Sequence, residues 1–189
     1  MQVDETGIPG LLLLTPKRFG DSRGWFSEVY NQATLQAATG LETVFVQDNH
    51  SLSRVRGTLR GLHCQRPPYA QAKLVRCGGG AVWDIAVDIR HGSPTFGQWR
   101  GYELSAENGN QLYIPTGFLH GFITLTPDAE LLYKCSAPYS AECDVSIRFD
   151  DPAFGVDWGD EVDLSLLSNK DREAPTLSEF ENPFTYEAE

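Results

Sequence analysis

The segment from Gly109 to His120 reads GNQLYIPTGFLH, and its glycines and proline indicate how this part of the chain folds. Glycine and proline mark turns because they supply or fix backbone conformations that strands avoid, and here they stand at 109, 115 and 117. The residues between and after them are mostly of types that favour strands. We therefore predict a short strand at 111–114, a tight turn, and a second strand at 120–125 that begins with His120.

A second segment has a related layout, because Gly57 is followed by five residues and then by His63, Cys64 and Gln65. Cupin-type jelly rolls use this paired spacing to direct side chains from two strands into a barrel. A metal-binding cupin would have a second histidine in place of Gln65, with an acid a little further on. The charged residue in that stretch is instead Lys73, and an ammonium group repels a divalent cation. We therefore expect no metal site. A lone histidine in a strand is most often a satisfied core residue, but two in register favour a pocket for an anion or a developing oxyanion.

The remaining chain consists mainly of short runs rich in β-branched and aromatic residues, separated by turn residues. The expected strands are 10–15, 25–30, 43–50, 58–64, 72–77, 81–89, 98–104, 111–114, 120–125, 130–136 and 145–149. In the run 81–89 the side chains alternate, which places Val82, Asp84, Ala86 and Asp88 on one face.

One segment is predicted to be helical: NQATLQAATG, with Asn31 as N-cap and Gly40 just past the end. A second short helix is expected near 162–167. The fold class is therefore all-β: a cupin-type jelly roll (double-stranded β-helix) with one or two short helices. Residues 1–189 are expected to form a single domain, with an acidic, looser C-terminal tail from about residue 172.

Charge and composition exclude several classes of protein. The net charge of −11 argues against nucleic-acid and membrane-surface binding, and no apolar run is long enough to span a bilayer. Since no secretory signal is visible and the four cysteines are irregularly spaced, we expect a cytoplasmic protein with reduced, buried thiols. From Asn49 to Trp83 there are six basic residues and no acid. Such a segment favours a focused anion site or a solvated, salt-bridged edge, and charge alone does not separate the two.

Nine motifs together resemble one enzyme family, dTDP-4-dehydrorhamnose 3,5-epimerase, from Gly10 to about Asp171. They are DSRGWFSE (21–28), QDNHS (47–51), RGLHCQ (60–65), AQAKLVRC (70–77), GSPTFGQW (92–99), IPTGFLHGF (114–122), LLYKCSAPYS (131–140), IRFDDPAFGVDW (147–158) and LSNKD (167–171). The resemblance implies a cupin without metal or other cofactor and a homodimer. It also implies a dTDP-linked 4-keto-6-deoxyhexose substrate, whose C3 and C5 are inverted on the route to dTDP-L-rhamnose.

The resemblance also assigns catalytic roles that suit this chemistry. A C–H next to a ketone loses its proton only to a well-placed base, while the enolate oxygen is stabilised. His63 is implied as the base, Asp171 as the residue that orients it, and Lys73 as the partner of the C4 oxyanion. Tyr133 is implied as the acid on the opposite face of the ring.

Substrate-binding roles follow from the same resemblance. Arg60 and Arg23 are expected to hold the diphosphate, Tyr139 to stack on thymine, and Arg23, Phe26 and Glu28 to act across the dimer. The other implied contacts are Gln47, Asn49, His120, Asp144 and Lys170. Two positions depart from the family pattern: the family often has glutamate where Asp144 stands, and the acidic segment after Trp158 replaces a form with proline.

Three alternatives stay open at this point. A 3-only or 5-only epimerase would share the same base, lysine and tyrosine. A non-catalytic sugar-nucleotide-binding cupin would have no need for those side chains together. A metal-dependent cupin oxygenase is disfavoured by Gln65 and Lys73.

Overall fold

The computed structural model describes residues 1–188, which form thirteen strands and a few short helical segments. The strands are β1 (Gln2–Glu5), β2 (Leu12–Thr15), β3 (Arg18–Asp21), β4 (Gly24–Ser27), β5 (Gln47–Ser53), β6 (Leu59–Gln65), β7 (Lys73–Gly79), β8 (Ala81–Asp88), β9 (Trp99–Ser105), β10 (Gln111–Ile114), β11 (Phe118–Thr124), β12 (Ala129–Cys135) and β13 (Asp144–Ser146). The helical segments are α1 (Gln32–Thr39), α2 (Asn169–Arg172) and the 3₁₀ turns Leu164–Leu166 and Leu177–Glu179. The all-β expectation is confirmed.

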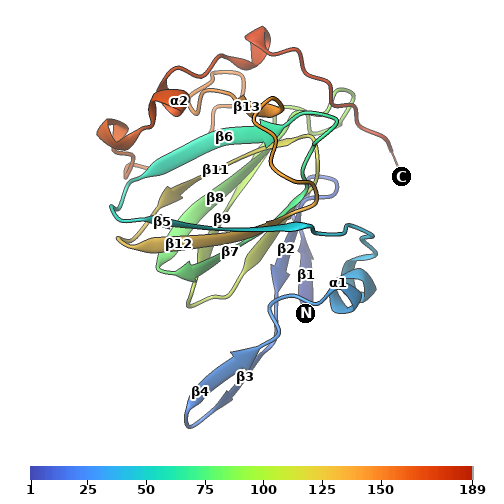
Figure 1. The fold of residues 1–189 in the computed structure, drawn as a ribbon, viewed down its shortest axis with the longest axis vertical. Helices are drawn as coiled ribbons and strands as arrows, with labels where there is room; N and C mark the ends of the chain where they lie inside the picture. Colours follow the sequence, from blue (N-terminus) through green and yellow to red (C-terminus); the bar gives the residue numbers. More distant parts are fainter. Residues whose placement is uncertain (189) are drawn as a thin grey trace.

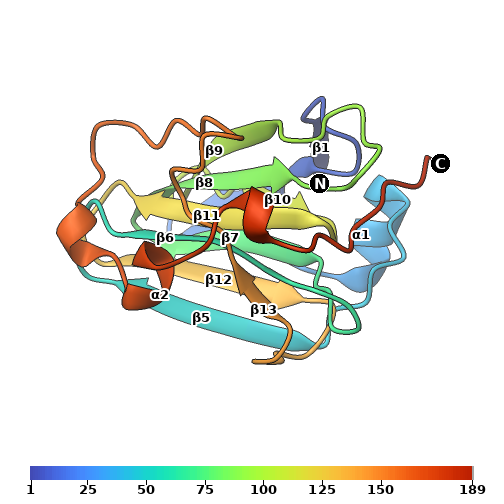
Figure 2. The ribbon, with the colours of Figure 1, turned by 90° about the horizontal axis from the view of Figure 1, so that it is seen from above.

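Two antiparallel sheets face each other, as a jelly roll requires (Figure 1, Figure 2). The six-stranded sheet has the order β1-β2-β10-β7-β12-β5, and the five-stranded sheet has the order β13-β6-β11-β8-β9. The two histidine-bearing strands, β6 and β11, are neighbours in the five-stranded sheet. His63 and His120 are direct partners in their register. The two related segments of sequence therefore come together in space.

The alternation predicted for β8 is confirmed, and both of its faces are buried. Val82 and Ala86 pack between the two sheets with residues of β7, β10 and β12. Ile85 and Val87 pack on the outer face against residues 147–186, which we call the C-terminal wrap. Fully burying a side chain of this size contributes about 1.5–3 kcal/mol. The wrap is therefore part of the hydrophobic core.

The C-terminal wrap corrects the expectation of a loose tail after residue 172. Phe184 is buried, the backbone of Tyr186 donates to His91 O at 2.9 Å, and Arg90 lies between the rings of Phe118 and Tyr186. Arg90 in turn is bonded to the buried carboxylate of Asp88 at 2.8 Å. The tail is acidic, but its aromatic residues pack on the sheet.

The motif GSPTFGQW completes this end of the sandwich. The hydroxyls of Ser93 and Thr95 donate to Asp88 at 2.6 and 2.8 Å, so the carboxylate has hydrogen-bond donors on several sides. The motif thus shapes the turn between β8 and β9, away from the histidines of β6 and β11.

Helix α1 follows the prediction closely. The side chain of Asn31 accepts from the backbone N–H groups of Ala33 and Thr34, and Gly40 ends the helix with φ of 74°. Near the C-terminus the expected helix at 162–167 is only partly correct, because a 3₁₀ turn at Leu164–Leu166 is followed by the separate helix α2.

Several strand assignments need correction. β1 and β3 were not expected, and the strand expected at 43–50 begins at Gln47 and ends at Ser53. The strands expected at 25–30 and 145–149 end earlier, at Ser27 and Ser146. β1 pairs only with β2, and β3 pairs only with β4, so both depend on partners that local composition does not reveal.

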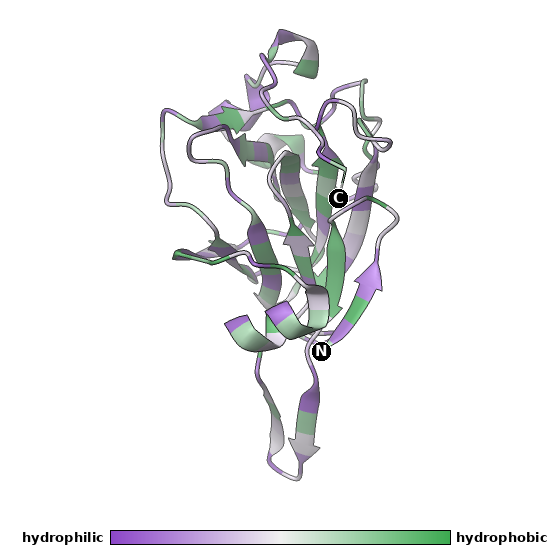
Figure 3. Cartoon of the chain, turned by 90° about the vertical axis from the view of Figure 1, so that its right-hand side faces the viewer, coloured by the Kyte–Doolittle hydropathy of each residue, from purple (hydrophilic) through white to green (hydrophobic). Residues whose placement is uncertain are grey.

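The hairpin β3–β4 extends away from the body of the molecule (Figure 3). Its side chains Phe19, Trp25 and Phe26 are 56%, 57% and 69% exposed. Arg18 anchors its base by donating to Ala106 O at 2.7 Å and by lying over the ring of Trp25.

All four cysteines are buried and unpaired, as expected. Among residues 1–188, no helix is long and apolar enough to cross a membrane.

Candidate active site

A cavity of about 450 Å³ lies beside the paired strands β6 and β11. Its lining comes from both sheets and from the C-terminal wrap. The residues are Ser51, Thr58, Leu59, Arg60, His63, Lys73, His120, Phe122, Leu131, Tyr133, Leu166, Ser168, Lys170 and Asp171. All four side chains predicted to be catalytic are in this set.

His63 and Asp171, which are 108 residues apart in the sequence, are in contact. His63 Nε2 lies 2.5 Å from Asp171 Oδ1, and the second carboxylate oxygen accepts from the Ser168 hydroxyl at 2.8 Å. Asp171 is only 4% exposed, because α2 places it against β6. Since Nε2 faces a carboxylate, it carries the ring proton, and Nδ1 is left free to accept one.

The electrostatics of this pair favour an ionised carboxylate. Burial alone would raise the pKa of Asp171, but the hydrogen bonds from His63 and from the Ser168 hydroxyl outweigh burial and hold the pKa below its usual value. Ser168 was not singled out from sequence, although a serine three residues before an acid is a recognised signal for a helix N-cap.

A second histidine–carboxylate pair stands beside the first. His120 Nε2 lies 2.9 Å from Oδ2 of Asp84, and both side chains are almost fully buried. Burial lowers the pKa of His120, more than the neighbouring Asp84 carboxylate raises it, so the neutral ring is favoured. Asp84 was missed as a site residue. Its signal was available, because the alternation of β8 already placed an acid on an inner face.

Lys73 and Tyr133 reach the cavity from the opposite sheet, on β7 and β12. Burial lowers the pKa of Lys73 and raises the pKa of Tyr133. The phenol of Tyr133 is therefore protonated at neutral pH and able to donate its proton.

This arrangement suits proton transfer on both sides of a flat or ring-shaped substrate. A base on one wall of a cavity and an acid on the other can remove a proton from one face of a carbon and return one to the other face. An ammonium beside them can stabilise an oxyanion that forms in between. The geometry thus fits inversion at a carbon next to a carbonyl.

The place of the metal ligand in other cupins is occupied by Gln65, which is buried and bonded to backbone groups. Within residues 1–188, no three His, Cys, Asp or Glu side chains are placed to hold a metal ion together.

Comparison with known proteins identifies the family. A family model described as dTDP-4-dehydrorhamnose 3,5-epimerase matches residues 5–179. The chain is also 54% identical to the dTDP-4-dehydrorhamnose 3,5-epimerase of Salmonella typhimurium over 179 aligned residues. The aligned region covers 95% of this chain and 97% of that protein. The chain belongs to the dTDP-4-dehydrorhamnose 3,5-epimerase family.

Solved structures agree with this family. The dTDP-6-deoxy-D-glucose-3,5-epimerase of Legionella pneumophila, solved in complex with dTDP-4-keto-L-rhamnose, superposes with a TM-score of 0.92 at 43% identity and covers 99% of each chain. A 3'-monoepimerase of Streptomyces bikiniensis, in complex with dTDP-quinovose, is also similar, with a TM-score of 0.83, 38% identity and 91% of this chain and 86% of that chain covered. The cupin jelly roll is thereby confirmed.

The basic residues expected to contact an epimerase substrate are only partly gathered at the cavity. Arg60 lines it and donates to Ser53 Oγ at 3.2 Å. Lys170 lines it too, but its ammonium is bonded to Asp144 at 2.6 Å. Two predicted contacts of the epimerase substrate thus bind each other in this structure.

The segment 49–83, which has basic residues but no acid, contributes both to a candidate anion site and to a solvated, salt-bridged edge. Arg60 and Lys73 line the cavity that holds His63, whereas Arg54 and Arg56 form exposed salt bridges with Asp128 and Glu161.

Three predicted binding residues of the epimerase lie outside the cavity of their own chain. Arg23 is 87% exposed and paired with Asp21, and Phe26 is exposed on the hairpin. Glu28 accepts from Asn31 and Thr34 at the start of α1.

Gln47, Asn49 and Tyr139 also do not line the cavity that holds His63. Gln47 accepts from the backbone of Tyr139 at 2.9 Å and donates to Asn49 at 3.0 Å. These residues form a connected cluster at the start of β5, next to the loop that carries Tyr139.

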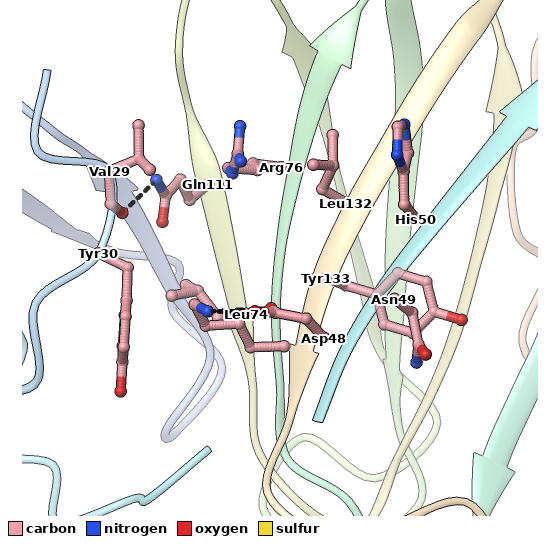
Figure 4. Close-up of a pocket in the computed structure, with 11 residues that line it drawn as sticks. Val29, Tyr30, Asp48, Asn49, His50, Leu74, Arg76, Gln111, Leu132 and Tyr133 are labelled. Carbon is pink, nitrogen blue, oxygen red and sulfur yellow. Dashed lines mark hydrogen bonds and ion pairs between the residues drawn. The ribbon is translucent and has the colours of Figure 1, made fainter. Parts of the chain in front are cut away.

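A second cavity, of about 440 Å³, lies on the outer face of the six-stranded sheet (Figure 4). Side chains of β5, β7 and β12 that point away from the cavity that holds His63 line this second cavity. They are Asp48, His50, Leu74, Arg76, Leu132 and Lys134. Of the four predicted catalytic residues, only Tyr133 borders it. We therefore assign the chemistry to the cavity that holds His63.

Proposed function

We propose that this chain epimerises C3 and C5 of dTDP-4-dehydro-6-deoxy-D-glucose to give dTDP-4-dehydro-L-rhamnose. Family membership makes it an isomerase of the carbohydrate-epimerase type. The observation that carries the proposal is the position of His63 on one sheet and of Lys73 and Tyr133 on the facing one, around a single cavity.

In each half of the reaction, Nδ1 of His63 takes the proton from the carbon next to the C4 ketone. The electron pair of the broken C–H bond forms a double bond between that carbon and C4, and the π pair of the ketone moves onto the C4 oxygen. The negative charge therefore develops on this oxygen, beside the Lys73 ammonium. Tyr133 then gives its phenolic proton to the other face of the same carbon, and the ketone reforms. His63 releases its proton to solvent and Tyr133 regains one, so the step is redox-neutral.

Asp171 supports the base without touching the substrate. Its carboxylate keeps the ring proton on Nε2 and stabilises the imidazolium that forms when Nδ1 accepts a proton. His120 lines the same cavity and is favoured as the neutral ring beside Asp84. We expect it to contact the reacting sugar as a hydrogen-bonding group.

Several further features belong to the proposal. We expect no metal and no other cofactor, no nucleic-acid partner, and a place in dTDP-L-rhamnose synthesis. The buried, unpaired thiols suit a reducing compartment such as the cytoplasm.

A homodimer is proposed because the hairpin is exposed and aromatic. Arg23 and Phe26 on the hairpin, with Glu28 just after it, stand away from their own cavity. They can serve as substrate contacts only if the hairpin reaches the site of a second copy. In that site Arg23 would join Arg60 at the diphosphate, and Phe26 would lie near Tyr139 and thymine.

A single-carbon epimerase is the second candidate, because the similar 3'-monoepimerase has the same fold. Both reactions need the base, the lysine and the tyrosine, so the identity of these residues does not separate the two.

The test is incubation of the purified protein with dTDP-4-keto-6-deoxyglucose in heavy water. Deuterium at both C3 and C5 is expected, whereas deuterium at one carbon would favour the single-carbon epimerase, and its absence from both would refute both candidates. His63→Ala should abolish exchange at both carbons, while His91→Ala, an exposed histidine outside the cavity, should not change it. Full activity after exhaustive chelation is expected as well.

A further inference from the structure

The loop 136–140, which carries Tyr139, follows directly after β12. Glutamine side chains from other parts of the chain hold it by hydrogen bonds to its backbone. Pro138 interrupts the loop, so its backbone groups need partners from elsewhere. Three glutamines supply them. The bonds are Gln71 Nε2 to Ala137 O at 2.7 Å, Gln65 Nε2 to Pro138 O at 3.1 Å, Tyr139 N to Gln47 Oε1 at 2.9 Å and Ser140 N to Gln65 Oε1 at 2.7 Å.

Gln65 has the central place in this arrangement, because it binds the backbone on both sides of Tyr139. Its amide nitrogen also donates to Tyr69 O at 2.7 Å, so both ends of the amide are engaged. The residue is only 4% exposed. A buried amide with all these bonds made has little freedom, and it transmits the rigidity of β6 to the loop.

The side chain of Tyr139 is exposed to solvent, yet its position is fixed by hydrogen bonds. It is 61% exposed, and its hydroxyl donates to Asp144 at 3.3 Å. Asp144 is the partner of Gln65 in the β6–β13 register, so the backbone and the hydroxyl of Tyr139 are both fixed from one pair of strands. An aromatic ring that is exposed yet held at both ends is organised for stacking before its ligand arrives.

Because side chains two residues apart share a face of a strand, Gln65 points to the same side as His63. It does not line the cavity that His63 lines. Its effect on the substrate must therefore pass through the loop.

We propose that Gln65 is a positioning residue that fixes Tyr139, through the loop 136–140, in the orientation that stacks on the nucleobase of the substrate. The inference rests on the stacking role proposed above for Tyr139. Gln65 thus supports recognition of the nucleotide from a position at which other cupins hold a metal.

The experiment is a double-mutant cycle on the full chain, with dTDP as the probe in calorimetric titrations. Since stacking of a base on an aromatic ring is worth roughly tenfold to a hundredfold in affinity, Tyr139→Ala should raise the Kd of dTDP by about that factor. Gln65→Met, which keeps the length but removes the hydrogen bonds, should raise Kd about three- to tenfold. With dTDP-4-keto-6-deoxyglucose it should raise KM similarly and leave kcat within about twofold.

The decisive measurement is Gln65→Met in the Tyr139→Ala background, where it should have no further effect on Kd. If the two changes multiply instead, Gln65 does not act through Tyr139 and the inference is wrong. It is also wrong if Gln65→Met alone binds dTDP as the wild type does. If Tyr139→Ala leaves Kd unchanged, the stacking role fails, and the inference fails with it, while the deuterium exchange in the proposed function is unaffected.

A folding defect is separated by a second variant. Should Gln65→Met not reach the folded state, Gln65→Asn replaces it in the same cycle, because it keeps the amide but is too short to reach both Pro138 O and Ser140 N. A smaller rise in Kd that vanishes in the Tyr139→Ala background supports the inference, and a rise that persists there overturns it.

Discussion

Replacing Asp171 by asparagine tests the proposed catalytic base through the residue that orients it. The amide has nearly the shape of the carboxylate, so the side chain can keep its contacts with the Ser168 hydroxyl and with the His63 ring. What it loses is the negative charge that lies 2.5 Å from His63 Nε2. It also gains an NH₂ group which, turned toward His63, would hold the ring in the opposite tautomer.

The size of the effect follows from the charge that develops on His63. When Nδ1 accepts a proton, the imidazolium and the Asp171 carboxylate attract each other. For unit charges about 4 Å apart at an effective dielectric constant of about 20, this attraction is worth roughly 4 kcal/mol. Since about 1.4 kcal/mol corresponds to a factor of ten in rate, we expect kcat to fall about 10³-fold.

The assay is the rate of deuterium incorporation at C3 and C5, which reports proton abstraction directly. KM should change little, because Asp171 faces the base rather than the substrate. Asp163→Asn is the matched control: Asp163 also lies in the C-terminal wrap and also accepts from a serine, Ser165, but it is exposed and does not line the cavity. Exchange in Asp171→Asn within about threefold of the wild type, at unchanged thermal stability, would refute the role of the pair.

Three other substitutions have distinct expected outcomes. Tyr133→Phe removes the acid, so turnover should fall by about 10²-fold or more; if turnover is unchanged, Tyr133 is not the donor. Lys73→Gln removes the partner of the oxyanion and should lower kcat about 10²- to 10³-fold, whereas a change in KM alone would contradict that role. Asp88→Asn should lower the free energy of unfolding by about 3 kcal/mol at pH 7, because it leaves Arg90 unpaired. Burial would raise the pKa of Asp88, but hydrogen bonds from Arg90, Ser93 and Thr95 hold it low. Its contribution is thus fully present above the unfolded pKa of about 3.9 and is lost as the pH falls from there through the lower pKa of the folded state. In urea titrations from pH 7 to pH 3, the difference between wild type and variant should therefore narrow at the acid end, and a constant difference would contradict the assignment.

Much of the fold could be predicted from local pattern, because alternation and turn residues are local signals. The strands that carry His63, Lys73, His120 and Tyr133 were placed to within a few residues, and the faces of β8 were assigned correctly. The errors share a cause. β1 and the hairpin strand β3 each pair with a single neighbour, and the packing of the wrap depends on an outer sheet face that no local pattern reveals.

The candidate site was predictable to a different degree. The spacing of Gly57, His63, Gly109 and His120 brought the two histidines together without knowledge of the family. Asp171 and Tyr133 needed the family resemblance, since nothing local links a residue of the wrap to β6. Asp84 and Ser168 each carried a local signal, as a residue of an inner strand face and as a helix N-cap, but their contacts with His120 and Asp171 are seen only in the structure. The bonds of Gln65 to the loop 136–140 had no local signal, because that loop lies more than 70 residues away in the sequence.

The proposed catalytic pair is divided between barrel and wrap, and this division has a consequence for how the chain becomes active. His63, Lys73 and Tyr133 are all in place once the strands have paired, but Asp171 arrives with a segment that is synthesised after every strand. A chain cut short before residue 171 would lose the carboxylate that contacts His63 together with the apolar contacts that Leu177 and Phe184 make on the outer sheet face. The proposed catalytic pair and the outer part of the hydrophobic core therefore depend on the same late segment. Loss of the wrap should lower activity and thermal stability together.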